Sequence, residues 1–524
     1  MDRKRNLRKE HGFENASPSK FRYTQLQIFP FDCGGRVAHK KRLGQFFTPE
    51  DVARTLVRWA VRKRNDRILD PSCGDGEFLI WHPHSVGIEI DGKHAATARE
   101  RAPASLVHEA DFFAWAGQTH ERFDAVVGNP PFIRYQGFVG EMRLKALALA
   151  KRIGADLPQL SSSWAPFIAA AAGLLRRGGR LSFVVPAEIG HSTYAVPLIR
   201  AIAKSFSCVH LIAIREKVFR NLSEDAWLLF ADGFGGCTQV VDLSVLDRFE
   251  ASSEPPPPLR RVSLDAWERC RGRLRRWLLP DRVLAAYEAV EQSNQTYRLG
   301  SVADVNIGYV TGANDFFHLR PSRARVLGIP PELLKITVRR GQLLPPGANL
   351  TRQHIRNWLN NDEPVHLLHL HGKMSLPRSV RDYLASEAAQ VARQAFKCRI
   401  RDPWYVIPNV TVPDGFLTSM SGDRAQLVRN GTECVATNSV HVVTMRKKGT
   451  FMSLQQGWRS SLATLSCEVE GHPLGGGMLK IEPREAQRIL LPKPGFGNDA
   501  LQDEVFREGI SIMRAWRHCS RPNP

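Results

Sequence analysis

The stretch Phe123–Phe132, Phe-Asp-Ala-Val-Val-Gly-Asn-Pro-Pro-Phe, places an amide and an aromatic ring directly after an apolar run. Residues 125–127 are typical of a strand buried on both faces, and the prolines end it because they offer no N–H to a sheet ladder. The Asn129 side-chain oxygen and the Pro130 carbonyl can accept two amino hydrogens, and Phe132 can stack on a flat ring. A proline turn alone would look the same, but the combination suits chemistry on the amino group of a planar base.

Three further predicted strands each end near an acid, and all of them precede Asn129. Residues 67–79, Arg-Ile-Leu-Asp-Pro-Ser-Cys-Gly-Asp-Gly-Glu-Phe-Leu, indicate a strand, a glycine turn and a helix, with Asp70 at the strand end. The strand over 85–91 carries Glu89, and the strand over 106–112 ends in Asp111 and Phe112. Because open α/β sheets bind ligands at the carboxyl ends of their strands, we expect these carboxylates in one crevice.

The acids decide between cofactors. The motif Gly-x-Gly-x-x-Gly is incomplete, since Leu79 stands where the third glycine belongs. A pyrophosphate prefers bare N–H groups without acids, whereas S-adenosylmethionine carries an ammonium, a sulfonium and ribose hydroxyls. We therefore assign Glu89 to the ribose, Asp111 to the adenine amino group and Phe112 to the adenine face. The turn over residues 74–76 would let the backbone approach the methionine part.

The order of strands and helices predicts an α/β catalytic domain with a Rossmann-like, seven-stranded sheet, whose last strands lie near 180–186, 209–215 and 226–231. A helix is expected to begin after Thr48, with that residue as its N-cap. We divide the chain into a basic extension (1–40), the catalytic domain (41–250), a linker with a proline run and a basic helix (251–296), and a mixed α+β domain (297–524).

The charge predicts a polyanionic partner. The 524 residues carry a net charge of +21 and a pI near 9.9, which favours nucleic acid, although solubility alone is an alternative. Five arginines within 269–276 can meet phosphates, or form a solvated helix face. Arg401, Trp404 and Tyr405 alternate charge with aromatic rings, a pattern suited to phosphates and bases. Asn438 lies in a polar turn that we also assign to substrate binding.

Other features argue against metal, membrane and export. Nine scattered cysteines without a Cys-x-x-Cys pair are typical of reduced thiols in a cytosol. No signal peptide and no long apolar run is recognised, so no membrane partner is expected. In a strand, His366 would face away from His369 and His371, so we expect no metal site.

Six segments in order resemble the gamma group of amino-methylating DNA methyltransferases, which modify the N6 amino group of adenine. They are Gly-Gln-Phe-Phe-Thr-Pro (44–49), Asp-Pro-Ser-Cys-Gly-Asp-Gly (70–76), Gly-Ile-Glu-Ile-Asp (87–91), Ala-Asp-Phe-Phe (110–113), Gly-Asn-Pro-Pro-Phe (128–132) and Val-Phe (218–219). The resemblance covers residues 41–235 well; segments 311–314 and 401–405 resemble the family's target-recognition domain more weakly.

The resemblance implies site roles. The cofactor site would comprise Gln45, Thr48, Asp70, Cys73, Gly74, Gly76, Glu89, Ile90, Asp111, Phe112 and Asn129. The target base would be held by Asn129, Pro130, Pro131 and Phe132, with Phe219 stacking on its other side. Many members end the catalytic motif in tyrosine where this chain has Phe132, so stacking is kept and a hydroxyl contact is lost.

The expected reaction is methyl transfer from S-adenosylmethionine to a flipped-out adenine of double-stranded DNA in a bacterial or archaeal cytoplasm, without a metal. Asn129 stands where a cytosine-C5 enzyme needs a cysteine nucleophile. Methylation of cytosine N4, of RNA or of protein glutamine stays open, as does a non-catalytic DNA-binding subunit. A role in restriction-modification or phage defence is implied, and a cognate restriction endonuclease is left open as a partner.

Overall fold

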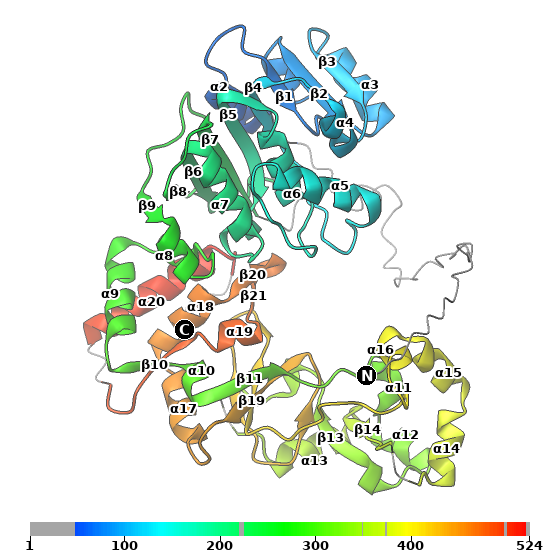
Figure 1. Cartoon of the computed structure of the whole chain (residues 1–524). Helices are drawn as coiled ribbons and strands as arrows, with labels where there is room; N and C mark the ends of the chain where they lie inside the picture. The colour runs from blue at the N-terminus through cyan, green and yellow to red at the C-terminus, as the bar shows by residue number, and fades with distance from the viewer. Residues whose placement is uncertain (1–47, 220–224, 348, 373–374, 497–499, 520–524) are drawn as a thin grey trace, which may run out of the picture.

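A nine-stranded sheet organises the N-terminal half of the protein (Figure 1). The computed structural model describes residues 48–219, 225–347, 349–372, 375–496 and 500–519, so the predicted extension over 1–40 and Gln45 lie outside the described residues. The strand order is β3-β2-β1-β4-β5-β7-β6-β8-β9. The strands are β1 (Ile68–Asp70), β2 (Ser85–Glu89), β3 (Leu106–Glu109), β4 (Phe123–Gly128), β5 (Leu175–Pro186), β6 (Phe206–Ile214), β7 (Ala226–Phe234), β8 (Val240–Leu246) and β9 (Arg260–Ser263).

Helices cover both faces of this sheet. Val126 of β4 packs into the cluster shared with α4 (Phe112–Gln118), α6 (Trp164–Ala172) and α7 (Ala195–Ser205), whereas Ala125 and Val127 pack against α2 (Glu50–Ala60). Two more helices are α3 (Gly92–Arg101), beside β2 and β3, and α5 (Gly140–Lys151), beside α4 and α6. The prediction that residues 125–127 form a strand buried on both faces is confirmed.

The predicted number of seven strands is wrong. All seven predicted strands are present, but β8 adds in parallel to β6, and β9 adds in antiparallel to β8. The sheet therefore continues past the predicted boundary at residue 250, to Ser263. The proline run that we expected to be an interdomain linker joins these two strands, and the Pro257 carbonyl accepts a hydrogen bond from Ser244 Oγ of β8 (2.9 Å).

A mixed α+β lobe follows. Its strands pair in the orders β11-β19-β15-β17, β12-β14-β13-β18, β16-β21-β20 and β10-β22. They are β10 (Thr296–Arg298), β11 (Ala303–Ile307), β12 (His318–Leu319), β13 (Leu334–Val338), β14 (His366–Leu368), β15 (Gly415–Thr418), β16 (Met420–Ser421), β17 (Leu427–Arg429), β18 (Val435–Ala436), β19 (Val440–Met445), β20 (His472–Leu474), β21 (Met478–Lys480) and β22 (Leu490–Pro492). Helices α11 (Asn314–Phe317), α12 (Pro321–Val326), α13 (Arg352–Asn360), α14 (Arg378–Leu384), α15 (Glu387–Gln394) and α16 (Phe396–Arg399) lie in the same lobe.

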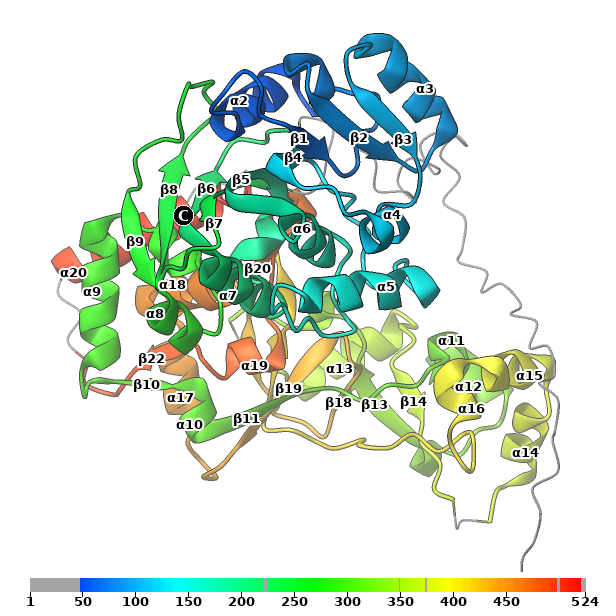
Figure 2. The same cartoon turned by 45° about the horizontal axis from the view of Figure 1, so that its top comes forward.

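The C-terminal helices return to the sheet domain. The helices α18 (Ser461–Glu470) and α20 (Ala500–Ala515) lie beside α8 (Leu264–Arg269) and α9 (Asp281–Gln292), between the sheet and the lobe (Figures 1 and 2). Phe506 and Met513 of α20 share one apolar cluster with Leu211 of β6. The division at residue 297 is therefore too simple, because burying the apolar faces of these helices joins the two parts. None of the described helices is long and apolar enough to cross a membrane.

Candidate functional site

A cavity of about 180 Å³ opens at the carboxyl ends of β1, β2 and β4 and the β3–α4 connection. These strands run parallel, so their ends meet at one edge of the sheet. Of the predicted site residues, seven line the cavity: Gly74, Glu89, Ile90, Asp111, Phe112, Asn129 and Pro131. The strand-end acids and the proline motif thus face the same space.

The Glu89 carboxylate is held by two backbone groups. Its Oε2 accepts from the N–H of Gly74 (2.9 Å) and its Oε1 from the N–H of Asp91 (2.8 Å). The side chain is buried at the cavity wall. Each carboxylate oxygen has a further lone pair, so Glu89 can still accept hydroxyl donors from a ligand.

The end of β3 supplies an acid and a ring. Asp111 is the N-cap of α4, and its Oδ1 accepts from the N–H of Ala114 (2.8 Å), which fixes the carboxylate at the cavity. Phe112 is buried, with its ring centroid 4.7 Å from that of Phe167. This arrangement presents a carboxylate next to an aromatic face.

Among the described residues, four predicted cofactor residues do not line the cavity: Thr48, and three residues around the glycine turn. Asp70 is fully buried below the turn, where its Oδ1 accepts from the N–H of Ser72 (3.1 Å). Burial, reinforced by the charges of Glu89 and Asp75, raises the pKa of Asp70 to about 8. Cys73 packs among apolar side chains, and Gly76, at a φ of +88°, approaches Ala98 so closely that a Cβ would lie 3.1 Å from its Cα. These residues shape the turn.

The Asn129 amide is oriented by Thr48. Its Nδ2 donates to Thr48 Oγ1 (3.2 Å), which turns the side-chain oxygen the other way. The prediction that Thr48 caps the following helix is wrong: Pro49 is at the N-cap position of α2, and no side chain caps the helix. The threonine hydroxyl acts on the amide of Asn129.

The other members of the proline motif are held in place, and Phe219 is not at the cavity. Pro130 is buried, Pro131 lines the cavity, and Phe132 is half-buried between the clusters on the two faces of the sheet. Phe219 is 7% exposed and packs in the cluster under α2. Phe219 does not line the cavity, but it belongs to the same apolar cluster against which Phe132 packs.

The residues of the lobe that we predicted to bind nucleic acid are distant in sequence from the cavity residues. Most of them contact other parts of the lobe. Arg401 donates to the carbonyls of Val310 and Thr311. The ring centroid of Trp404 lies 5.5 Å from that of Phe316, and the ring centroid of Tyr405 lies 6.0 Å from that of Trp404. Asn438 is exposed, and its N–H donates to the Tyr309 carbonyl (3.0 Å). Arg401 therefore joins the stretch over 311–314 to that over 401–405.

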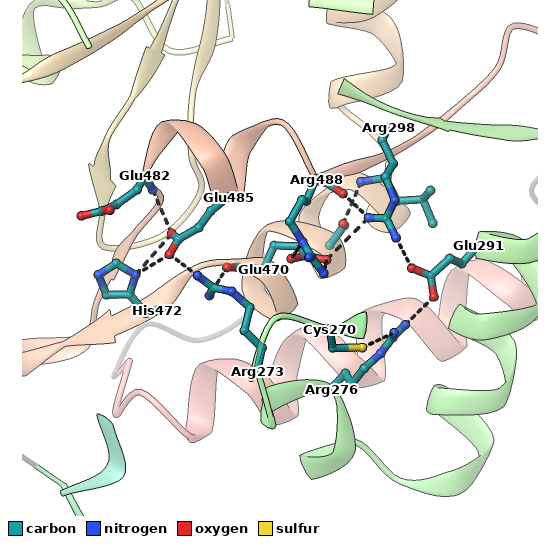
Figure 3. A network of polar contacts seen from close by, with 12 residues as sticks. Cys270, Arg273, Arg276, Glu291, Arg298, Glu470, His472, Glu482, Glu485 and Arg488 are labelled. Carbon is teal, nitrogen blue, oxygen red and sulfur yellow. Dashed lines mark hydrogen bonds and ion pairs between the residues drawn. The ribbon is translucent and has the colours of Figure 1, made fainter. Parts of the chain in front are cut away.

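Three of the five arginines in the run over 269–276 are engaged within the protein, whereas Arg269 and Arg271 are exposed. Arg273 pairs with Glu485, and Arg276 pairs with Glu291 (Figure 3). Arg275 is buried and donates to the Glu468 carbonyl (3.1 Å); burial lowers its pKa to about 10. Arg273 and Arg275 thus anchor the segment after β9 to the last part of the lobe.

Glu470 extends the same network. Its carboxylate accepts from Arg488 Nε (2.6 Å) and lies 3.6 Å from Arg298 Nη1 (Figure 3). Glu485 also accepts from His472 Nδ1 (3.0 Å). Burial alone would raise the pKa of Glu485, but His472 and Arg273 outweigh it and hold the pKa below its usual value.

Sequence reasoning missed part of the cavity wall. Ser72, His94, Ile133, Phe138, Met142, Ser163 and Phe167 also line it. The serine run before the apolar helix over 164–175 was the available signal, but serines there are typical of ordinary helix caps. Among the residues with described placement, no group of three His, Cys, Asp or Glu side chains is arranged to hold a metal ion.

Three family models match the chain. The C-terminal domain of Type II methyltransferase M.Eco57I matches residues 272–517, the Eco57I restriction-modification methylase matches 86–219, and the N-6 DNA Methylase family matches 36–98. The second model thus covers Glu89, Asp111 and the proline motif, and the first covers most of the lobe.

Curated relatives agree with these models. Type II methyltransferase M.AccI of Acinetobacter calcoaceticus is 20% identical over 497 residues, covering 89% of this chain and 88% of the relative. Type II methyltransferase M.TthHB8I of Thermus thermophilus is 34% identical over 164 residues, which span 29% of this chain and 36% of the relative. Among solved structures, the Type IIL restriction-modification enzyme MmeI in complex with DNA aligns with a TM-score of 0.47, at 11% identity, over 91% of this chain and 73% of that one.

Together, the cavity at the strand ends, the family models and the curated relatives define the class of protein. The fold is mixed α/β with one large sheet, and the methyl donor of this class is S-adenosylmethionine. The chain is an N6 DNA methyltransferase.

Proposed function

We propose that the protein methylates the N6 amino group of an adenine that is flipped out of duplex DNA, as a gamma-group enzyme of a restriction-modification system. Asn129 Oδ1 and the Pro130 carbonyl accept the two amino hydrogens, which directs the nitrogen lone pair at the sulfonium methyl. Phe132 stacks on the base. Because S-adenosylmethionine already carries the methyl group on a sulfonium, the protein contributes chiefly by positioning the two reactants.

One observation carries the proposal: Glu89 and Asp111 line the same cavity as Asn129 and Pro131. The two acids suit the ribose hydroxyls and the adenine amino group of S-adenosylmethionine, and Phe112 suits its adenine face. Asp70 lies behind the turn, and a cationic ligand nearby would favour the ionised form of its carboxyl group. The proline motif then meets the methyl-bearing end.

The test is a product analysis. Duplex DNA without adenine methylation is incubated with the protein and S-adenosylmethionine bearing a deuterated methyl group, and is then digested to nucleosides. Mass spectrometry should find labelled N6-methyladenine. Labelled N4-methylcytosine, or label only in RNA or protein offered in parallel, would contradict the proposal.

Glu89→Ala should weaken binding of S-adenosylmethionine about 10- to 100-fold, because a hydrogen bond to a charged group contributes about 1.5–3 kcal/mol. The substitution also removes the acceptor of the Gly74 N–H, so the turn loses an anchor. Calorimetric titration in the absence of DNA measures the effect.

Glu109→Ala is the matched control. Glu109 also ends a strand of this edge, in β3, but it is exposed and does not line the cavity. Its loss should change affinity less than three-fold. Equal losses in the two variants would mean that net charge, and not a contact from Glu89, controls binding.

The DNA-contacting surface of the lobe is proposed to include Arg339 and Arg340, at the end of β13. Their neighbours are the exposed Asn438 turn, through the bond from Thr437 Oγ1 to the Arg339 carbonyl (2.9 Å), and the loop around Tyr309. Within the described part of the chain, neither arginine has a recorded ion pair, in contrast to Arg273 and Arg276. Cations without carboxylate partners can exchange counterions for phosphates.

Binding to duplex DNA should therefore weaken steeply with salt, and Arg339→Ala/Arg340→Ala should reduce the log–log slope by about 1–2, since each phosphate contact contributes about 0.9. Fluorescence anisotropy at several salt concentrations measures the slope. Arg248→Ala/Arg282→Ala removes the same charge from exposed pairs with Glu250 and Glu508, and should leave the slope unchanged. A flat salt response of the unmodified protein would refute this surface.

A further inference from the structure

Ser163 contacts the proline motif at three points. Its hydroxyl donates to the Pro131 carbonyl and accepts from the N–H of Ile133 (2.9 Å), and its own N–H donates to the Ile133 carbonyl (2.9 Å). The residue is 1% exposed and lines the cavity. One serine from the α6 segment thus clamps the backbone on both sides of Phe132.

Helix capping does not explain this serine. Ser163 stands at the N-cap position of α6, but it has a helical φ and ψ of −59° and −33°, and its side chain makes no capping hydrogen bond. Serines favour such positions because the hydroxyl can accept from the first helical N–H groups. Here the hydroxyl is directed at residues 131 and 133 instead.

The backbone carbonyls of Asn129, Pro130 and Pro131 differ in their hydrogen bonding. Ser72 Oγ donates to the Asn129 carbonyl (3.2 Å), and Ser163 Oγ donates to the Pro131 carbonyl. For the Pro130 carbonyl between them, no hydrogen bond is recorded among the described residues. Since neither proline has an N–H, the two serine hydroxyls hold the carbonyls on either side of the Pro130 carbonyl.

We propose that Ser163 is a positioning residue for methyl transfer, whose hydroxyl holds the proline motif so that the Pro130 carbonyl is aimed at the target amino group. The inference rests on the proposed function of Asn129 and Pro130. Without the hydroxyl, the Pro131 carbonyl and the Ile133 N–H lose their buried partner, and the loop relaxes. A displacement of about 1 Å at a reacting centre can cost about 100-fold in rate.

The test compares Ser163→Ala with Ser161→Ala. Ser161 is also buried, and its hydroxyl also holds a proline carbonyl, that of Pro158 (2.7 Å), but it does not line the cavity. Single-turnover transfer of tritiated methyl to duplex DNA without adenine methylation is measured by rapid quench. Affinity for S-adenosylmethionine and melting temperature are measured on the same preparations.

Ser163→Ala should lower the single-turnover rate about 10- to 100-fold, with affinity for S-adenosylmethionine changed less than about three-fold. Ser161→Ala should lower the melting temperature similarly and keep the rate within about two-fold. A normal rate in Ser163→Ala, or equal rate losses in both variants, would overturn the inference. Absence of methyl transfer by the unmodified protein would instead refute the proposed function.

Discussion

Asn129→Ala is expected to lower the rate of methyl transfer about 100- to 1000-fold while S-adenosylmethionine affinity stays close to that of the unmodified protein. The target nitrogen gains positive charge in the transition state, so losing an oriented acceptor affects that state more than the bound ground state. The amide is held for this role by Thr48 Oγ1, 3.2 Å from Nδ2. Single-turnover rates and calorimetric titration separate the two effects.

The control for this prediction is an exposed asparagine that does not line the cavity. Asn361→Ala removes an amide at the C-cap of α13, away from the cavity, and should keep the normal rate. Melting temperatures of both variants show whether a lost rate reflects unfolding. A stable Asn129→Ala protein that binds S-adenosylmethionine and methylates DNA at the normal rate would remove the basis of the proposed mechanism.

Glu470→Ala should destabilise the protein by about 3–5 kcal/mol, because it removes the buried carboxylate of an ion pair and leaves the mostly buried Arg488 guanidinium without its partner. The Glu470 side chain is 5% exposed and accepts from Arg488 Nε at 2.6 Å, with Arg298 also within ion-pair distance (Figure 3). The network joins the segment after β9 to α18 and the end of the lobe, so its loss weakens the connection between the two parts. Denaturant titration followed by tryptophan fluorescence measures the loss.

Glu250→Ala provides the matched comparison for a surface pair. Glu250 is 71% exposed and pairs with Arg248 at 3.1 Å, so its loss should change the free energy of unfolding by less than about 1 kcal/mol. Equal effects of the two substitutions would show that the buried network contributes no more than a solvent-exposed pair.

The local sequence alone predicted the strands at this edge of the sheet and the polar side chains at their ends. The apolar run over 125–127 with the two prolines behind it, and the acids at 89 and 111, could be predicted because strand formation and strand termination depend on neighbouring residues. Parallel strands then bring their carboxyl ends together, so Asp70, Glu89 and Asp111 were expected in one crevice. Glu89 and Asp111 line the cavity together with Asn129, whereas Asp70 is buried below the turn.

Only the tertiary structure decided which partners distant residues find. Arg273 and Glu485 are 212 residues apart in the sequence. The residues next to the arginine run therefore do not predict which carboxylates pair with it. Trp404 is packed against Phe316, and Phe219 is buried under α2, because each aromatic ring stabilises the fold by leaving water, whichever function its neighbours suggest. Ser163 looks like a helix cap in the chain, and its role became visible only where α6 meets the proline motif. Local propensity determines the elements, but contacts between distant segments determine which side chains remain available to a ligand.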